Sequence, residues 1–201
     1  MKSKEPKYNG SMSLQAGDAL LVVDIQNDFC PGGALGVSAG DEVIPMLNRW
    51  IGEARAKGVP VFATRDWHPA DHISFRQRGG PWPPHCVQGT HGAEFHPDLR
   101  LPPDAQIVSK ATTPDVESYS AFGDTDLAKR LRGAGVKRVW IGGLAQDYCV
   151  RYSSLDAIKQ GFEVHVIVDA TRAVNVNPED GRRALQEIKR AGGILEEPAP
   201  R

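Results

Sequence analysis

The chain has 201 residues, of which 40% are hydrophobic and 24% charged, a composition typical of a globular protein with one complete core. The net charge is -1 and basic residues alternate with acidic ones, so the charge pattern favours neither nucleic acid nor an anionic membrane as a partner. No apolar run approaches the roughly 20 residues needed to cross a bilayer, which argues against a membrane-spanning protein.

The N-terminal segment and the cysteines indicate the cellular compartment of the protein. Residues 1–14 carry charge but lack the apolar stretch of a secretion signal, and we predict a flexible tail there, followed by a single domain over residues 15–201. Three cysteines, Cys30, Cys86 and Cys149, are too few and too scattered for a disulfide framework. These features indicate a reducing compartment, so we expect a cytoplasmic protein.

The first part of the chain predicts a strand, a helix and a second strand. ALLVVDIQ (19–26) is a continuous apolar run, as in a strand buried on both faces of a sheet, and VPVFAT (59–64) is a similar short run. Between them, residues 41–58 predict a helix that ends at a glycine. Its apolar stripe consists of Val43, Leu47, Trp50, Ile51 and Ala54.

Strand and helix patterns continue to alternate along the rest of the chain. Further strands are predicted at residues 105–110, 136–143, 162–170 and 193–196. Helices are predicted at residues 124–135, 146–161 and 177–193. In the last helix, Asn177 is a candidate N-cap and Pro178 takes the first helical position.

This alternation predicts a three-layer α/β/α sandwich with a mainly parallel, Rossmann-like sheet of six strands. In such sheets, ligands bind beyond the carboxyl ends of the strands. Residues 65–104 hold no convincing helix or strand, and a loop of that length in a compact domain is usually functional.

Three residues with reactive side chains follow three different predicted strands. Asp24 lies near the end of the first, Lys110 ends the strand 105–110, and Cys149 follows the strand 136–143 after a short turn. Because the carboxyl ends of parallel strands lie at one edge of a sheet, an acid, an amine and a thiol can meet there. They form a candidate nucleophilic triad, in which the carboxylate takes the thiol proton and the ammonium stabilises the resulting charges.

Cys149 also falls in the first turn of the predicted helix 146–161. The positive end of the helix dipole favours a thiolate, so we expect a lowered cysteine pKa, and backbone N–H groups at this helix start can form an oxyanion hole. Each residue also has a structural interpretation: Cys149 as a small buried apolar group, Asp24 as the cap of a turn, and Lys110 as a solvated charge. Their shared position at strand ends favours the catalytic interpretation.

The long loop begins with RDWHPADHISF (65–75), an aspartate and two histidines within seven positions. In an extended chain, residues i and i+2 point the same way, so Asp66 and His68 can share one metal ion. A proline argues against a continuous helix through His68 and His72, and His85 offers a third donor. One carboxylate with two imidazoles suits zinc, manganese or iron and leaves positions open for a substrate. A polar loop also carries histidines by chance, so the spacing leaves both interpretations open.

The other histidines and cysteines favour structural interpretations. His91 and His96 lack paired donors, His165 alternates within a predicted strand, and Cys30 and Cys86 lack a strand-end position. The sequence contains no G-x-G-x-x-G fingerprint, P-loop or G-x-S-x-G elbow, so hydride transfer, phosphoryl transfer and serine hydrolysis lose support.

Taken together, the motifs resemble those of the nicotinamidases among the isochorismatase-like cysteine hydrolases. The resemblance covers residues 20 to about 155 and rests on five stretches in the family's order, a combination that is highly specific. The stretches are LLVVDIQNDFCPGGALGV, TRDWHPADHISF, GGPWPPHCVQGTHGAEFHP, VSKATTPDVESYSAF and GLAQDYCV.

The resemblance implies a catalytic triad of Asp24, Lys110 and Cys149. It also implies a cis peptide bond between Leu144 and Ala145, which turns the backbone N–H groups of Ala145 and Cys149 towards the oxyanion. The implied reaction is hydrolysis of nicotinamide, and of pyrazinamide as well, to the acid and ammonia through a thioester, as a step of NAD salvage. The family often assembles, so we expect a homo-oligomer.

The resemblance further implies a divalent metal ion held by Asp66, His68 and His85, with His72 as an extra ligand or a group behind the ligands. Zinc is the first choice, and manganese and iron are alternatives. The metal would orient the substrate by binding the pyridine nitrogen, directly or through water, rather than activate the nucleophile. The family's substrate-stacking positions are matched by Phe29, Trp82 and Tyr119.

Two positions depart from the family pattern: Gln146 replaces a threonine and Ala121 replaces a glycine. Neither change removes a catalytic atom, but both bear on substrate preference and on the geometry of the helix start. Two rival functions are a metal-independent cysteine hydrolase of ureido or carbamoyl compounds on the same fold, and a non-catalytic, metal-stabilised binding protein. The metal-ligand pattern argues against the first, and the second predicts an unreactive Cys149.

Overall fold

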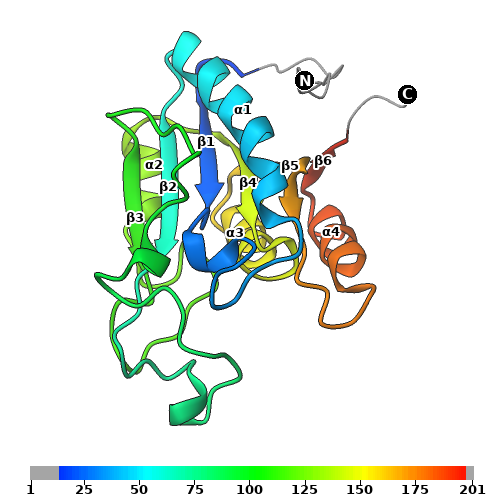
Figure 1. Cartoon of the computed structure of the whole chain (residues 1–201). Coiled ribbons are helices and arrows are strands. Elements are labelled where there is room, and N and C mark those ends of the chain that lie inside the picture. The colour runs from blue at the N-terminus through cyan, green and yellow to red at the C-terminus, as the bar shows by residue number, and fades with distance from the viewer. Residues whose placement is uncertain (1–13, 198–201) are drawn as a thin grey trace, which may run out of the picture.

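The structure, a computed structural model, describes residues 14–197 (Figure 1). Within these residues, six strands form one sheet in the order β3-β2-β1-β4-β5-β6, and every neighbouring pair is parallel. The strands are β1 (Asp18–Val23), β2 (Val61–Asp66), β3 (Gln106–Lys110), β4 (Arg138–Leu144), β5 (Glu163–Arg172) and β6 (Ile194–Glu196). The predicted Rossmann-like sheet is therefore confirmed.

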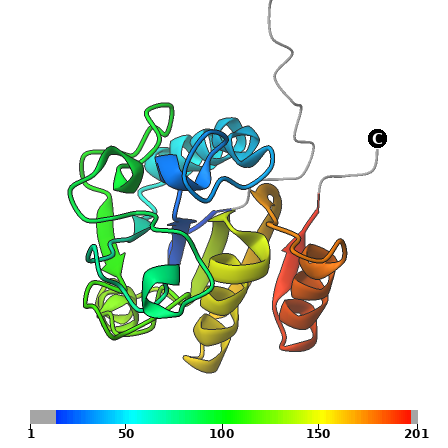
Figure 2. The same ribbon diagram turned by 60° about the horizontal axis from the view of Figure 1, so that its bottom comes forward.

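Helices cover both faces of the sheet and complete the predicted three layers (Figures 1 and 2). The α-helices are α1 (Ile44–Ala56), α2 (Leu127–Gly133), α3 (Arg151–Lys159) and α4 (Asp180–Arg190). The core on one face contains the buried stripe predicted for α1, and the core on the other contains buried residues of α2, α3 and α4. No helix in the described part of the chain is long and apolar enough to span a membrane.

The ends of the strands differ from the prediction at the edge where the candidate site lies. Strand β1 ends at Val23, because Asp24 takes a left-handed backbone conformation with a φ of 49°. Strand β2 continues through Asp66, which pairs in register with Lys110 of β3. Asp66 is thus a strand residue, and the sheet holds its backbone beside that of Lys110.

The predicted start of the last helix is wrong. Helix α4 begins at Asp180, and neither Asn177 nor Pro178 belongs to its first turn. The carboxylate of Asp180 accepts the backbone N–H of Asn177 at 2.7 Å, and the side-chain oxygen of Asn175 accepts the N–H of Gly181 at 2.9 Å. These side chains stabilise a turn before the helix, so the helix begins at Asp180 rather than at Pro178.

The predicted tail lies outside the described residues except for Leu14. That side chain is 2% exposed and packs in the core on the α1 side of the sheet, so the folded part of the chain includes it. The long loop over residues 65–104 has only short 3-10 turns and isolated bridges after the end of β2, as predicted. Most of it lies beyond the carboxyl ends of the strands, at the lower end of Figure 1, and its last residues return to the start of β3.

The amino ends of β1 and β4 are held together by an ion pair whose carboxylate is buried and whose guanidinium is partly exposed. The Asp18 carboxylate accepts two hydrogen bonds from the Arg138 guanidinium, at 2.7 and 2.8 Å, and further bonds from the Trp140 indole and the Gln15 backbone. Asp18→Asn halves the number of acceptor oxygens, so we expect a loss of about 2 kcal/mol in the free energy of unfolding. Urea denaturation measures it, with the exposed Asp115→Asn as a control expected to change stability by less than about 0.5 kcal/mol.

Candidate active site

The side chains of Asp24, Lys110 and Cys149 meet at the carboxyl ends of β1, β3 and β4. The Lys110 Nζ lies 3.0 Å from Oδ2 of Asp24 and 3.5 Å from Sγ of Cys149, and it also pairs with Oδ1 of Asp66. The Thr64 hydroxyl donates to the other oxygen of Asp24 at 2.6 Å. All five residues are at most 5% exposed, so these charges interact with little solvent screening.

Burial acts on every ionisable group of this cluster. It raises the pKa of Asp24, although the Lys110 ammonium opposes the rise. Burial also raises the pKa of Asp66, but there Lys110 and His68 outweigh it and hold the pKa well below its usual range. For Lys110, burial lowers the pKa, yet Asp24 and Asp66 outweigh it and the pKa lies well above its usual value. Lys110 is therefore an ammonium ion and Asp66 a carboxylate.

The expected lowering of the Cys149 pKa is wrong. Burial raises the pKa of this thiol well above its ordinary value, and the attraction of Lys110 does not overcome it. The helix that carries Cys149 also begins with a wide π-helical turn, Gln146–Val150, rather than with an α-helical turn. A thiol with a raised pKa keeps its proton at neutral pH, and a carboxyl oxygen of Asp24 lies within 4.8 Å of Sγ.

The three predicted metal ligands converge. One donor atom each from Asp66, His68 and His85 lies within 4.8 Å of the others, and all three residues are buried. The Nδ1 atoms of His68 and His85 hydrogen-bond to the carbonyls of Ala111 and Pro83, at 3.2 and 2.8 Å, so Nε2 is the ring atom of each that is available to a metal ion. A carboxylate and two imidazoles fit a divalent ion such as zinc with open coordination positions. Burial also lowers the pKa of His85, which favours the neutral ring.

The structure places His72 beside the three ligands rather than among them. Its ring stacks on that of His68, with 4.2 Å between the centroids. Both of its nitrogens are engaged, Nδ1 with the Ser74 hydroxyl at 2.8 Å and Nε2 with the Val116 carbonyl at 3.0 Å. This arrangement favours a supporting role behind His68 over direct coordination.

A pocket links the thiol to the candidate metal ligands. Asp66, His85, Ala145 and Cys149 all line it. The indole N–H of Trp82 donates to the Tyr119 hydroxyl at 2.9 Å, so these two rings hold each other in place. The remaining walls are apolar or aromatic and consist of Phe29, Leu35, Val37, Trp82, Tyr119, Tyr148 and Val174. A flat heteroaromatic ring suits this lining.

Residues 18–197 match the Isochorismatase domain family. The chain belongs to the isochorismatase family. The nicotinamidase of Escherichia coli (strain K12) is 41% identical to this chain over 198 residues. The match covers 88% of this chain and 93% of that relative.

Solved structures agree with this family assignment. The pyrazinamidase of Pyrococcus horikoshii in complex with zinc has a TM-score of 0.87 and 57% identity, over 90% of this chain and 99% of that one. A protein of L. infantum in complex with nicotinate has a TM-score of 0.82 and 38% identity, over 90% of this chain and 93% of that one. The resemblance that the motifs carried is therefore confirmed.

Gln146, which replaces a threonine of the family pattern, fits at the start of the helix that carries Cys149. The Leu144–Ala145 peptide bond is cis, as expected. The Gln146 amide donates to the Gly181 carbonyl at 2.9 Å and accepts the Thr171 hydroxyl at 2.8 Å, so it ties the turn to β5 and α4. A threonine is too short to make both contacts.

The Ala121 departure lies in the core of this isochorismatase domain. Its backbone N–H donates to the Ser153 hydroxyl of α3 at 2.9 Å, and its side chain is fully buried. The side chain does not line the pocket beside Cys149, so this difference does not reach the substrate directly.

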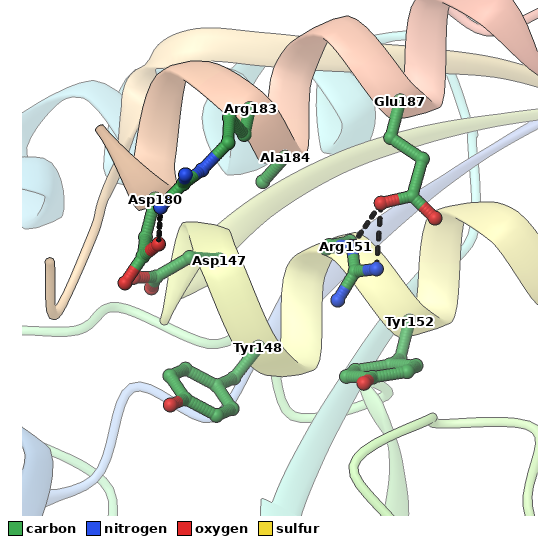
Figure 3. Close-up of a pocket in the computed structure, with 8 residues that line it drawn as sticks. All are labelled: Asp147, Tyr148, Arg151, Tyr152, Asp180, Arg183, Ala184 and Glu187. Atoms are coloured by element: carbon green, nitrogen blue, oxygen red, sulfur yellow. Dashed lines mark hydrogen bonds and ion pairs between the residues drawn. The ribbon is translucent and has the colours of Figure 1, made fainter. Parts of the chain in front are cut away.

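A second hollow lies outside the active site, between α4 and the helix that carries Cys149 (Figure 3). Four of its charged side chains form two ion pairs, Arg151 with Glu187 and Arg183 with Asp180. Tyr148 lines both this hollow and the pocket beside Cys149, so the two are neighbours. Neither the thiol nor a candidate metal ligand lines the hollow, and we place the site in the pocket.

Four residues that line the pocket could not be identified from the sequence. Leu35, Val37 and Val174 look like ordinary core residues, and Tyr148 stands out only as the neighbour of Cys149. The structural interpretations made from the sequence agree with the packing: His165 is buried and stacks on Trp140, while Cys30 and Cys86 are buried and unpaired with another cysteine.

Proposed function

We propose that this chain hydrolyses nicotinamide to nicotinic acid and ammonia, a step of NAD salvage, and accepts pyrazinamide as well. The observation that carries the proposal is the single pocket in which Cys149, Asp66 and His85 face one aromatic-lined space. The nicotinamidase and pyrazinamidase relatives support it. A small ring amide fills such a space with its carboxamide against the thiol.

The proposed reaction exchanges two bonds at the carboxamide carbon. Asp24 takes the thiol proton as Sγ of Cys149 bonds to that carbon, and the proton then passes to the nitrogen as the C–N bond breaks and ammonia leaves. Water next attacks the resulting thioester and gives a proton to Asp24, and the C–S bond breaks to release the acid. The proton returns to Sγ, so the catalyst is restored.

Two further features stabilise charge along this path. The Lys110 ammonium lies between Asp24 and Cys149 and stabilises the negative charge whether it resides on oxygen or on sulfur. The backbone N–H groups of Ala145 and Cys149 would donate to the oxyanion that forms on the amide oxygen. Both residues line the pocket.

Asp66, His68 and His85 would hold the divalent ion, with zinc as the first choice because a zinc complex is known for the Pyrococcus horikoshii pyrazinamidase. Manganese and iron remain alternatives, since a set of nitrogen and oxygen ligands accepts several divalent ions. When bound, the ion supplies a coordination position for the ring nitrogen of nicotinamide and so orients the ring.

Ammonia release tests this function. The purified protein is assayed with nicotinamide and with a ureido acid, before and after removal of metal by a chelator and after addition of zinc. We expect release from nicotinamide only, lost on chelation and recovered with zinc. Release from the ureido acid without metal would instead show the rival hydrolase, and no release from either compound would favour a binding protein.

His68→Ala tests the assignment of the metal ligands. We expect zinc affinity to fall by at least about 100-fold, and KM for nicotinamide to rise, because the site loses one of three donors. The same substitution at the exposed His91 serves as the control and should leave both values unchanged. Equal zinc affinity in the two variants would rule out His68 as a ligand.

A further inference from the structure

The side chain of Gln26 is fully buried and holds the backbone of Asp66. Its amide nitrogen donates to the Asp66 carbonyl at 2.7 Å, and its amide oxygen accepts the Asp66 N–H at 2.8 Å. The same nitrogen donates to the Ala93 carbonyl at 2.9 Å. Three short bonds therefore fix this amide, and two of them go to a single residue.

The sheet explains why Asp66 needs this partner. In a parallel sheet, the N–H and C=O of one residue both point to the same neighbouring strand. On the β1 side, register pairing of β2 stops at Ala63, because β1 ends at Val23 and the chain then turns at Asp24. The Gln26 amide takes the place that a further residue of β1 would have filled beside Asp66.

The other side of Asp66 is held by β3. The N–H of Trp67 donates to the Lys110 carbonyl at 3.1 Å, and Asp66 pairs in register with Lys110. Of the Asp66 carboxylate, Oδ1 pairs with the ammonium of Lys110, while Oδ2 lies 3.5 Å from Nε2 of His68. The backbone of Asp66 is thus clamped from both sides, and Oδ2 is the oxygen left for a metal ion.

Gln26 also joins Asp66 to the part of the long loop that contains Ala93 and Phe95. Besides the bond to Ala93, Gln26 forms an isolated antiparallel bridge with Phe95, and the neighbouring Asn27 N–H donates to the Glu94 carbonyl at 3.0 Å. The position of Asp66 therefore depends on contacts that reach both strands and loop. Ligand distances in a metal site hold to within about 0.2 Å, so a small shift of this backbone is felt at the ion.

We propose that Gln26 is a positioning residue that sets the affinity of the Asp66, His68 and His85 site for a divalent cation. The inference rests on the proposed function for the assignment of these ligands. Removing the amide frees the Asp66 backbone on the β1 side and lets Oδ2 move away from the two imidazoles. The metal is held by fewer well-placed donors, although no ligand has been removed.

The test is the zinc dissociation constant of the full-length protein, measured by competition with a chelating dye and without any substrate. Gln26→Met keeps the length of the side chain and removes its three hydrogen bonds, and we expect an affinity lower by about 10- to 100-fold. Gln26→Asn, which shortens the side chain but stays polar, is the milder variant should the first fail to fold, and we expect a smaller loss in the same direction.

Two controls separate positioning from general weakening of the fold. Asn48→Leu, in α1, also removes an amide that donates to one backbone carbonyl, of Asp98, and accepts one backbone N–H, of Arg100. Neither partner adjoins a metal ligand, so zinc affinity should change by no more than about twofold. Asp18→Asn lowers stability at the far end of the sheet and should also leave zinc affinity unchanged.

Zinc affinity in the Gln26 variants that matches wild type, or that falls no further than in Asp18→Asn, would overturn the inference. A selective fall in the Gln26 variants supports it even if wild type releases no ammonia from nicotinamide. In that case the proposed function fails while the role of Gln26 at the cation site stands.

Discussion

Replacement of Cys149 with alanine is expected to lower kcat/KM for ammonia release from nicotinamide by at least about 10³-fold. The side chain is 5% exposed and Sγ lies 3.5 Å from Nζ of Lys110, so the substitution removes the nucleophile and little else. Asp24 and Lys110 keep their ion pair, and the metal ligands are not touched. Zinc affinity should therefore stay close to that of wild type while turnover disappears.

Cys30→Ala is the matched control, because Cys30 is also buried but does not line the pocket. Burial raises the pKa of the Cys30 thiol to about 11, as burial also raises that of Cys149, but only Cys149 lies beside Asp24 and Lys110. We expect normal turnover in this variant. If Cys149→Ala still released ammonia at a tenth of the wild-type rate or more, a thioester on this residue could not be the main path.

Replacement of Lys110 with methionine is expected to cause the largest loss of stability. The ammonium is 1% exposed and lies between Asp24 and Asp66, so its removal leaves two buried carboxylates without a counter-ion. We expect a loss of about 3–5 kcal/mol in the free energy of unfolding at about pH 7, together with the loss of turnover. Urea denaturation measures the first and ammonia release the second.

The pH dependence of this loss follows from the carboxylates. Lys110 holds the pKa of Asp66 below its usual range, so in wild type the pair contributes stability above the ordinary carboxyl pKa and loses it as the pH falls. Without Lys110, burial raises the pKa of both carboxyls, and protonation removes their repulsion. The stability difference between variant and wild type should therefore shrink as the pH is lowered.

The exposed Lys159, which pairs with Asp156 on α3, offers a control for the same substitution. Lys159→Met should change the free energy of unfolding by less than about 0.5 kcal/mol, both at about pH 7 and at lower pH, because an exposed ion pair contributes little. If the difference between Lys110→Met and wild type stayed constant or grew as the pH fell, the buried carboxylates could not be its cause.

The fold was predictable because its signals are local and repeated. Apolar runs such as 19–26 read as buried strands whatever surrounds them, and the stripe of α1 follows the helical period. The position of Asp24, Lys110 and Cys149 at strand ends then follows from parallel topology alone. The ends of elements were less predictable: the start of α4 depends on side chains of Asn175 and Asp180 that form a turn before the helix.

The missed parts of the site depend on three-dimensional burial that no local pattern encodes. The helix dipole at Cys149 was a sound local argument, but burial of the thiol acts in the opposite direction and is the larger effect. Gln26 reads as an ordinary polar residue at the end of a strand, and its role appears only when β2 is seen to extend beyond β1. Val174 enters the pocket from the segment after β5, which holds none of the site residues predicted from the sequence.

The way nicotinamide binds decides between the proposed function and its rivals, and a crystal structure of Cys149→Ser with zinc and nicotinamide would show it. We expect the ring between the aromatic walls, with its nitrogen on the side of Asp66, His68 and His85. We also expect the carboxamide carbon within about 3.5 Å of the serine Oγ. Nicotinamide bound with its carboxamide towards the zinc, or outside this pocket, would contradict the proposed function.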